Sequence, residues 1–441
     1  MASERLFEVL SYWNLWGKGT FPTGIDRDVK TELLPWLARP EVVAICGLRR
    51  CGKSTLMRQL LRSLVEERGV PAADTFFVNF EDPIFLEHSP DAALLDHVFE
   101  TFLELARPAH TPYLFLDEIH TVSGWERWAR ARTETGRARI VVSGSSSRLL
   151  DPDLATVLTG RHLTRTLWPL SFPELLRFRG LELGDPTGLL TEGVRLRQEL
   201  SRYLRHGGLP EVVLAENDDI RTNLLKQYFR DLLYRDVVSR HEIRDVRALE
   251  TLAHHYLTNT ANTTSYNRLK NAYGMAIDQV RSYTRYLEDA FLIREVPRFS
   301  HKVTGQERAP RKVYAIDVGL RNAVAFQFSQ DLGRLAETLV FAHLVRDEDT
   351  RVFYFQGRNE CDFLTWRGTR AERVIQVCFE NEGSALPSRE LAGLEEAMDA
   401  TGLETGWILT RDLSRTFEDS RGRLVHAVPV WRWLCESAVP T

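Results

Sequence analysis

The sequence predicts an α/β protein with a parallel three-layer core at its N-terminal end, a helical middle and a small α/β domain at its C-terminal end. Three observations support this fold class. Short apolar strands alternate with helical stripes over residues 42–144, helical periodicity dominates residues 224–293, and strands return after residue 350. Strands that alternate with helices pair in parallel, and helices cover both faces of the sheet. The expected domains are 1–170, 171–318 and 319–441.

The composition is that of a globular protein without a membrane segment. The 441 residues include 43% hydrophobic and 27% charged residues and suffice for about two to four domains. The net charge of −4 does not predict nucleic-acid binding, although it leaves room for a local basic face. The N-terminus lacks a signal-peptide pattern, no apolar run is long enough to span a bilayer, and the five cysteines form no CxxC pair. We therefore expect a reduced, cytoplasmic protein with no membrane partner.

A glycine-rich loop, GLRRCGKST (47–55), lies between a predicted strand and a predicted helix. VVAIC (42–46) precedes it as a short buried strand, and residues 55–69 carry apolar side chains at helical spacing. This context distinguishes a phosphate-binding G-x-x-x-x-G-K-[ST] loop from a chance match to the pattern. A loop without a ligand would not require both flanking elements.

Each residue type in this loop suits a nucleotide phosphate. Gly47 and Gly52 let the backbone curl so that N–H groups point at phosphate oxygens, and the helix N-terminus adds partial positive charge. Lys53 can reach the β- and γ-phosphates, and the Ser54 hydroxyl can ligate Mg²⁺. ATP and Mg²⁺ are therefore the expected cofactors. The residues predicted to bind them are Gly47, Arg50, Cys51, Gly52, Lys53, Ser54 and Thr55.

The strand PYLFLDEIH (112–120) supplies the second half of such a site. Four apolar or aromatic residues precede Asp117 and Glu118. Asp117 would bind Mg²⁺ directly or through water, and Glu118 would orient and polarise the attacking water. A water-orienting acid favours hydrolysis over simple binding. The alternative is a surface turn that carries two acids.

Two further candidates follow the predicted strand at 139–144. Ser146, with Ser145 as the alternative, is suited to sensing the γ-phosphate or holding the attacking water, but a helix N-cap explains it equally well. Arg161 is a candidate finger that neutralises transition-state charge, in cis or from a neighbouring subunit. A structural arginine paired with a local acid is an equally good interpretation.

Taken together, the motifs GLRRCGKST, YLFLDEIH, VVSGSSS, LTGR and WPLSFPELL resemble those of prokaryotic AAA+-type P-loop ATPases that carry a C-terminal domain of unknown function. The resemblance runs from about residue 25 almost to the C-terminus. It implies a five-stranded AAA-like core, ATP hydrolysis and a homo-oligomer in which Arg161 acts in trans. IDRDV (25–29) resembles a family segment near the nucleotide base, but we assign no role to Arg27 from this.

The middle of the chain predicts a winged helix. Residues 265–274 and 276–293 suggest two helices joined by a turn, and strands at 292–299 and 311–317 can pair across a basic loop. The family resemblance supports this assignment. A protein-interaction or lid module is an equally good interpretation of the same pattern. The residues that would contact DNA are Gln279, Arg281 and Arg285 on the second helix and His301, Lys302, Arg308 and Arg311 in the loop.

The C-terminal domain follows the element order of restriction endonucleases. A helix with Glu337 precedes a strand, a strand with Asp362 and a strand with Gln376 and Cys378. That chemistry needs two acids, or an acid and a glutamine, as Mg²⁺ ligands and usually a lysine. The resembled family has such a domain. By position, the first three of these residues match its ligands, while the lysine position falls on Cys378. A helix at 388–403 and strands at 406–410 and 426–434 complete the domain.

Cys378 argues against nuclease activity. A cysteine has no positive charge, its thiolate is a poor partner for Mg²⁺, and the glutamine offers only a neutral carbonyl. No lysine lies between residues 313 and 441. Arg358, Arg370 or Arg373 could replace the charge, although an arginine cannot act as a base. We therefore expect a degenerate nuclease-like domain that is kept for binding or assembly.

The sequence as a whole predicts Mg²⁺-dependent ATP hydrolysis coupled to conformational change, with DNA as the leading candidate substrate. One alternative is a nucleotide-dependent switch or scaffold that binds a protein partner. A third possibility is an ATP-powered nuclease, which would depend on residues 362–378.

Overall fold

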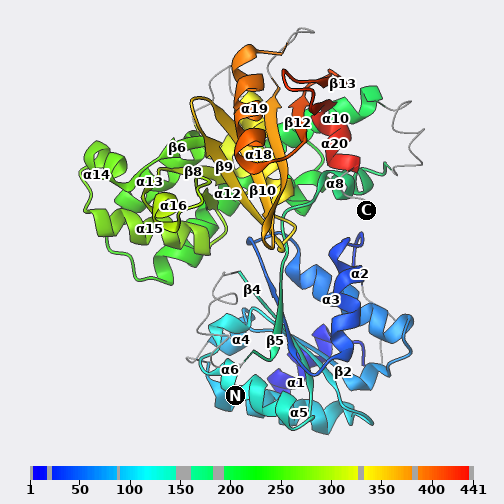
Figure 1. The fold of residues 1–441 in the computed structure, drawn as a ribbon. Coiled ribbons are helices and arrows are strands. Elements are labelled where there is room, and N and C mark those ends of the chain that lie inside the picture. Colours follow the sequence, from blue (N-terminus) through cyan, green and yellow to red (C-terminus); the bar gives the residue numbers. More distant parts are fainter. Residues whose placement is uncertain are drawn as a thin grey trace. The chain divides into compact units, whose positions relative to one another are not determined.

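The chain divides into two compact units, Met1–Trp168 and Pro169–Thr441 (Figure 1). The second unit continues across residues 318 and 319, where the third domain is expected to begin, and the three expected domain ranges stay predictions. No helix in the described part of the chain is long and apolar enough to cross a bilayer. The computed structural model describes residues 3–16, 22–86, 90–145, 160–181, 193–325, 332–379 and 386–436.

The first unit is built on a parallel five-stranded sheet. Its strands are β1 (Val42–Cys46), β2 (Thr75–Asn79), β3 (Tyr113–Asp117), β4 (Arg139–Gly144) and β5 (His162–Thr166). They lie in the order β2-β3-β4-β1-β5. The strands predicted at 42–46, 112–120 and 139–144 are confirmed as β1, β3 and β4, whereas β5 was not predicted. This edge strand reads HLTRT and buries only its last residue, so it carries little apolar signal. The five-stranded core that the resemblance implies is confirmed.

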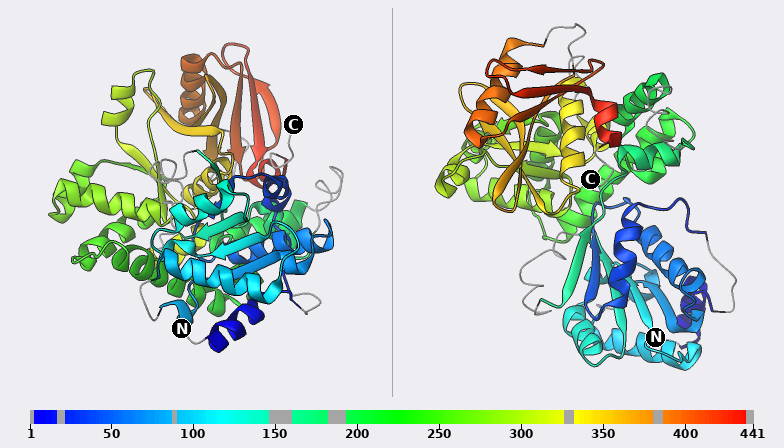
Figure 2. Two further views of the ribbon diagram at one scale, coloured as in Figure 1. Left: turned by 90° about the horizontal axis from the view of Figure 1, so that it is seen from below. Right: turned by 45° about the vertical axis from the view of Figure 1, so that its right-hand side comes forward.

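Helices cover both faces of this sheet (Figure 2). They are α1 (Ser3–Trp13), α2 (Val29–Leu33), α3 (Lys53–Glu66), α4 (Pro83–Leu86), α5 (Ala92–Ala106) and α6 (Trp125–Glu134), with 3₁₀ turns η1 (Leu34–Ala38), η2 (Ala72–Asp74) and η3 (Ile119–Thr121). The buried stripe of α3 packs on β3 and β4, and α6 packs on β4 and β1. Asp91 caps α5 because its carboxylate accepts from the N–H groups of Ala93 and Leu94 at 3.1 and 3.2 Å.

The second unit begins with helices and continues into a small antiparallel sheet. The elements are α8 (Phe172–Phe178), α10 (Gly193–His206), α11 (Pro210–Leu214), α12 (Asp218–Asp231), the π-helical η5 (Leu232–Ser239), α13 (Val246–Thr258), β6 (Asn262–Thr264), α14 (Tyr266–Tyr273), α15 (Ile277–Asp289), β7 (Ile293–Val296), α16 (Val303–Arg308), β8 (Arg311–Ala315) and α17 (Val318–Val324). The two predicted helices and the hairpin are confirmed, and the sheet order is β6-β8-β7. The basic loop contains α16, and β6 is too short to show a strand pattern.

A six-stranded mixed sheet forms the C-terminal part. Its elements are α18 (Leu332–Leu344), β9 (Thr350–Gln356), β10 (Glu360–Arg367), β11 (Arg370–Cys378), α19 (Ser388–Thr401), β12 (Thr405–Thr410), β13 (Arg415–Glu418), β14 (Leu424–Pro429) and α20 (Val430–Glu436). The order is β13-β14-β12-β11-β10-β9, antiparallel from β9 to β11 and parallel from β11 to β14. The strand predicted at 426–434 is wrong in its second half, where the chain enters α20 at Val430.

The small sheet and the C-terminal domain adjoin within the second unit. The N–H of Phe299 donates to the carbonyl of Tyr354 at 2.7 Å, and the N–H of Tyr354 donates to the carbonyl of Pro297 at 3.2 Å. The Tyr314 ring of β8 stacks on Phe341 of α18, with ring centroids 4.4 Å apart. Side chains of β8 therefore pack directly against the C-terminal domain.

Candidate functional site

The glycine-rich loop at 47–55 adopts a backbone that requires glycine at two positions. Gly47 has φ 147°, and a Cβ there would lie 2.2 Å from the carbonyl oxygen of Leu167. Gly52 has φ 99° and begins α3. Arg50 also has a positive φ, 67°, which costs about 1–3 kcal/mol in a residue with a side chain. The loop is thus a pre-formed, strained turn that leads directly into a helix N-terminus.

Lys53 connects this loop to the acids of β3. Its Nζ atom donates to the carbonyls of Gly47 and Leu48 at 3.1 and 3.2 Å. The same atom lies 3.9 Å from Oε1 of Glu118, and the side chain is 3% exposed. A single buried ammonium therefore faces both the loop and Glu118, which is where a γ-phosphate and its water would meet.

Asp117, at the end of β3, is the most deeply buried acid of the site. The Ser143 hydroxyl donates to its Oδ1, and Ser54 also faces this carboxylate. Its Oδ2 is buried and has no hydrogen bond of normal geometry to the described residues. Burial and the neighbouring Glu118 raise the pKa of Asp117 to about 6. An unpaired carboxylate oxygen beside a hydroxyl at the start of α3 fits a hard cation with oxygen ligands, such as Mg²⁺.

Glu118 is held in one orientation as an ionised carboxylate. It adopts φ 53°, and its Oε2 accepts from the N–H of Ser145 at 3.2 Å. Nδ1 of His120 lies 3.2 Å from the same oxygen. Burial alone would raise the pKa of Glu118, but Lys53, His120 and Arg49 together hold it at about 2. Such a weak base suits the orientation and polarisation of a water better than the uptake of its proton in the ground state.

The two predicted serines have different outcomes. Ser146 lies outside the described residues, and its role stays a prediction. Ser145 contacts Glu118 through its backbone N–H. No role was predicted for Ser143, although its hydroxyl donates to Asp117 and accepts from the N–H of Glu118 at 3.1 Å. Its place at the end of β4, in the strand next to β3, was the signal that could have identified it.

Arg161 lies at the end of the sheet where β1 and β5 begin, and the phosphate loop lies at the end where β1 finishes. It directly precedes β5, which runs parallel to β1 with His162 opposite Val42. The loop follows the other end of β1, one five-residue strand or roughly 16 Å away. The Arg161 guanidinium is 61% exposed and pairs with Glu134 at 2.9 Å. This separation argues against the cis role. The pair with Glu134 is the arrangement that the structural interpretation predicts, and a role toward a neighbouring subunit stays a prediction.

The remaining predicted residues of the phosphate loop differ in their exposure to solvent. Arg50 and Thr55 are exposed, whereas Cys51 is fully buried and burial raises the pKa of its thiol. Arg27, to which no role was assigned, donates from Nη1 to the Cys51 carbonyl at 2.7 Å and from Nη2 to the Trp168 carbonyl at 2.8 Å. Arg27 therefore braces the loop through carbonyl contacts that leave no trace in a sequence motif.

The predicted DNA contacts lie on α15, just before and at the end of α16, and at the start of β8. Arg281 and Arg285 are one turn apart, and their side chains are 58% and 73% exposed. Within the described residues, each forms an ion pair only with an acid of the same helix, at 3.5 and 4.0 Å. Lys302 is exposed. Gln279 differs, because its Nε2 donates to Oδ2 of Asp245 at 3.3 Å. Arg281 and Arg285 are thus accessible on α15, and His301, Lys302 and Arg308 are accessible in the basic loop.

A cluster of acids in the C-terminal domain surrounds one buried lysine. Nζ of Lys312 lies 2.6 Å from Oε1 of Glu337. It also lies 2.7 Å from Oε1 of Glu360 and 2.9 Å from Oδ1 of Asp362, with 2% of the side chain exposed. Burial opposes this positive charge, but Asp362 and Glu337 raise the pKa of Lys312 well above its usual value. The backbone of Lys312 belongs to β8, so its side chain crosses into the neighbouring domain.

The predicted Glu337, Asp362 and Gln376 meet at this cluster. The N–H of Asp362 donates to Oε1 of Gln376 at 3.1 Å, and the Gln376 amide donates to Glu390. Oδ2 of Asp362 accepts from a backbone N–H of β11 at 3.0 Å. Cys378, at the end of β11, packs in the apolar core, and burial raises the pKa of its thiol. The oxygens that a metal would need are therefore already used by the chain.

These residues do not fit a Mg²⁺ site. The ammonium of Lys312 takes the central position, and no group of three or more metal-ligating side chains in the described ranges is arranged around a common point. The expectation that the domain lacks a lysine, so that only Arg358, Arg370 or Arg373 could replace its charge, is wrong. The lysine is Lys312, which directly precedes the lysine-free range 313–441.

Comparisons with known proteins agree with the parallel sheet and phosphate loop of the first unit. An AAA domain model matches residues 39–176, and a domain of unknown function (DUF8612) matches residues 197–331. The uncharacterized protein MJ1544 of Methanocaldococcus jannaschii is 31% identical over 424 residues, 93% of this chain and 90% of that protein. An uncharacterized protein of Haemophilus influenzae is 25% identical over 77% of this chain and 82% of its own length.

Solved structures show weaker similarity. The Walker-type ATPase of Pyrococcus abyssi has a TM-score of 0.44 and 13% identity over 68% of this chain and 95% of its own. AMPPCP-bound DnaA from Aquifex aeolicus has a TM-score of 0.27 and 17% identity over 64% of this chain and 92% of its own. The AAA domain match spans the sheet from β1 to β5 together with the glycine-rich loop.

Proposed function

The chain belongs to a family of AAA-domain P-loop ATPases that includes MJ1544 of Methanocaldococcus jannaschii, and on this premise we propose that it hydrolyses ATP with Mg²⁺ and couples hydrolysis to a conformational change. The observation that carries the proposal is the pair of acids at the end of β3, one with an unpaired buried oxygen and one ionised. Asp117 and Ser54 would hold the cation, which would neutralise phosphate charge. Lys53 would bind the phosphates, and Glu118 would orient the water.

The middle domain favours DNA as the partner of this ATPase. The succession α13, β6, α14, α15, β7 and β8, with sheet order β6-β8-β7, is the arrangement that a winged helix requires. Arg281 and Arg285 project from α15, the helix that such a domain places in a groove.

The second candidate is a nucleotide-dependent switch or scaffold for a protein partner. The lysine-filled cluster favours it, since a C-terminal domain without a metal site can still bind or assemble.

Charge reversal on α15 separates these two functions. DNA should stimulate ATP turnover by the full chain, and the double variant Arg281→Glu with Arg285→Glu should lose the stimulation and bind DNA at least about tenfold more weakly, since phosphate contacts are electrostatic. Turnover is measured with and without single- and double-stranded DNA. The matched control reverses Arg230 and Arg235, two exposed arginines of the preceding helices. Turnover that ignores DNA in every variant would favour the switch.

A homo-oligomer would allow Arg161 to complete a neighbouring site. Arg161→Ala and Lys53→Ala chains should each lose about 10³-fold or more in turnover when measured alone. A mixture should recover part of the activity, because an intact phosphate loop on one chain then faces an intact arginine on the next. Turnover and solution mass are measured before and after mixing. Full activity of Arg161→Ala alone would show that the residue only pairs with Glu134.

A further inference from the structure

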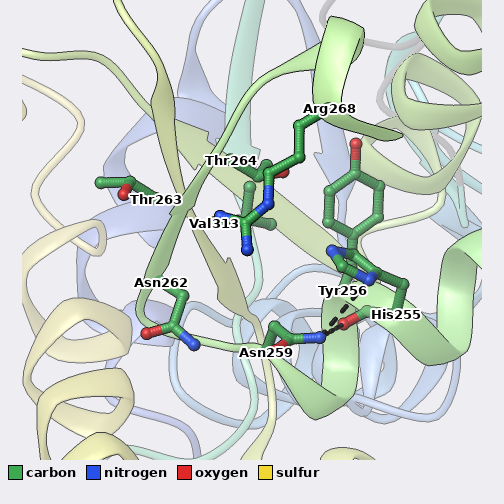
Figure 3. Close-up of a pocket in the computed structure, with 8 residues that line it drawn as sticks. All are labelled: His255, Tyr256, Asn259, Asn262, Thr263, Thr264, Arg268 and Val313. Atoms are coloured by element: carbon green, nitrogen blue, oxygen red, sulfur yellow. Dashed lines mark hydrogen bonds between the residues drawn. The ribbon is translucent and has the colours of Figure 1, made fainter. Parts of the chain in front are cut away.

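A polar pocket of about 290 Å³ lies in the middle domain. It adjoins the hollow at the acid cluster, because Asn262 lines both. Its walls come from the end of α13, from β6 and from α14 (Figure 3). Arg268 reaches over it from α14, and Asn259 and Asn262 lie across from the guanidinium (Figure 3). No acidic side chain lines this pocket. Apart from Val313, the lining side chains can all donate hydrogen bonds, and Arg268 adds one fixed positive charge.

The hydrogen bonds of His255 make its ring a donor to the pocket. Nδ1 lies 2.7 Å from the Tyr273 hydroxyl and 3.4 Å from Nδ2 of Asn259. The same amide nitrogen donates to the His255 carbonyl at 2.9 Å. In the tautomer whose proton lies on Nε2, Nδ1 can accept from both groups, and this is the tautomer that the proposal below uses. Burial, and then Arg268, lower the pKa of His255 and keep the ring neutral. Figure 3 shows the other ring nitrogen turned toward Arg268.

Two polar groups of the pocket have no partner in the described chain. The Thr264 hydroxyl is buried without a hydrogen bond, and the residue is only 7% exposed. The Arg268 guanidinium makes none of the ion pairs or side-chain hydrogen bonds found among the described residues. A buried hydroxyl without a partner costs about 1–3 kcal/mol, which a ligand that accepts its hydrogen bond would offset. An oxyanion between Thr264 and Arg268 would satisfy both.

We propose that this pocket binds a phosphate group. A phosphate oxyanion matches a guanidinium, two amides, hydroxyls and a neutral imidazole, and a carboxylate-free lining leaves nothing to repel it. The group could belong to a nucleic-acid backbone or to free phosphate. The first source deepens the DNA action proposed above and rests on it, because Arg268 would then add a backbone contact beside α15. The second source is independent of DNA.

The test removes the guanidinium and compares two ligands. Arg268→Gln should bind a fluorescently labelled DNA duplex roughly tenfold more weakly than the wild-type chain, with a salt dependence reduced by about one phosphate contact. In a Lys53→Ala background, where the phosphate loop is disabled, inorganic phosphate should raise the Tm, and adding Arg268→Gln should abolish that rise. Arg247→Gln is the matched control, since Arg247 is an exposed arginine of α13 that does not line the pocket.

The outcomes separate the pocket from the DNA proposal. A loss in the DNA measurement supports a nucleic-acid phosphate, and a loss in the phosphate measurement alone supports a free phosphate. If the wild-type chain does not bind DNA while phosphate still raises the Tm of the Lys53→Ala chain through Arg268, the DNA proposal is contradicted and the phosphate pocket is supported. If Arg268→Gln equals the Arg247→Gln control with both ligands while its own Tm shows a folded protein, the pocket is not a phosphate site.

Discussion

Replacing Glu118 by Gln should lower ATP turnover by roughly 10²–10⁴-fold while ATP binding is retained. The amide keeps the size of the side chain but removes the negative charge, and it can turn a donor toward the water. Wild-type Glu118 is ionised throughout the physiological range because Lys53, His120 and Arg49 hold its pKa at about 2. The loss should therefore be similar from pH 6 to pH 9 and should appear in kcat rather than in the Kd for ATP.

Steady-state phosphate release and equilibrium binding of labelled ATP measure the two quantities separately. Glu66→Gln is a suitable control, since Glu66 belongs to α3 of the same unit and its side chain is 50% exposed. Normal turnover by Glu118→Gln would remove Glu118 from the proposed mechanism. An equal loss of binding and turnover would assign it to nucleotide binding.

Replacing Lys312 by Met should destabilise the second unit by about 3–5 kcal/mol at pH 8, because the change leaves the buried Glu337 and Asp362, and the half-buried Glu360 beside them, without their cation. Burial and Asp362 already raise the pKa of Glu337 to about 8 in the presence of the lysine. A carboxyl whose pKa is raised on folding stabilises the fold at low pH, and this contribution is lost as the pH rises through the folded value. The variant should thus recover part of its stability at pH 5.5.

Urea unfolding at the two pH values measures this effect, with Lys302→Met as the control for removing an exposed lysine of the same unit. Loss of the ammonium should also allow Mn²⁺ to bind, so that Mn²⁺ raises the Tm of Lys312→Met but not of the wild-type chain. Metal-dependent cleavage of DNA by the wild-type chain that disappears in Asp362→Ala would contradict the metal-free interpretation of the cluster.

Local chemistry explains why the nucleotide site was predictable. The glycines, Lys53 and Ser54 are contiguous, and Asp117 and Glu118 end an apolar strand, so spacing alone places them at one edge of a parallel sheet. The contribution of Arg27 was hidden, because a side chain that bonds two carbonyls does not need a particular neighbour in sequence. Arg161 was placed near the site only by its motif, and the parallel pairing of β5 with β1 put it at the opposite edge.

The sequence by itself determined the parallel core, the phosphate loop and the acids of β3, because each depends on a short pattern within one element. The meeting of Glu337, Asp362 and Gln376, which lie on three elements, followed from the family resemblance. Only the tertiary structure decided what the acid cluster contains. Cys378 occupies the position of the lysine in the motif, and a strand 66 residues earlier in the chain supplies the ammonium at Lys312. A buried group of carboxylates requires a cation within a few ångströms. Any residue that the fold brings this close can supply the cation, wherever it stands in the sequence.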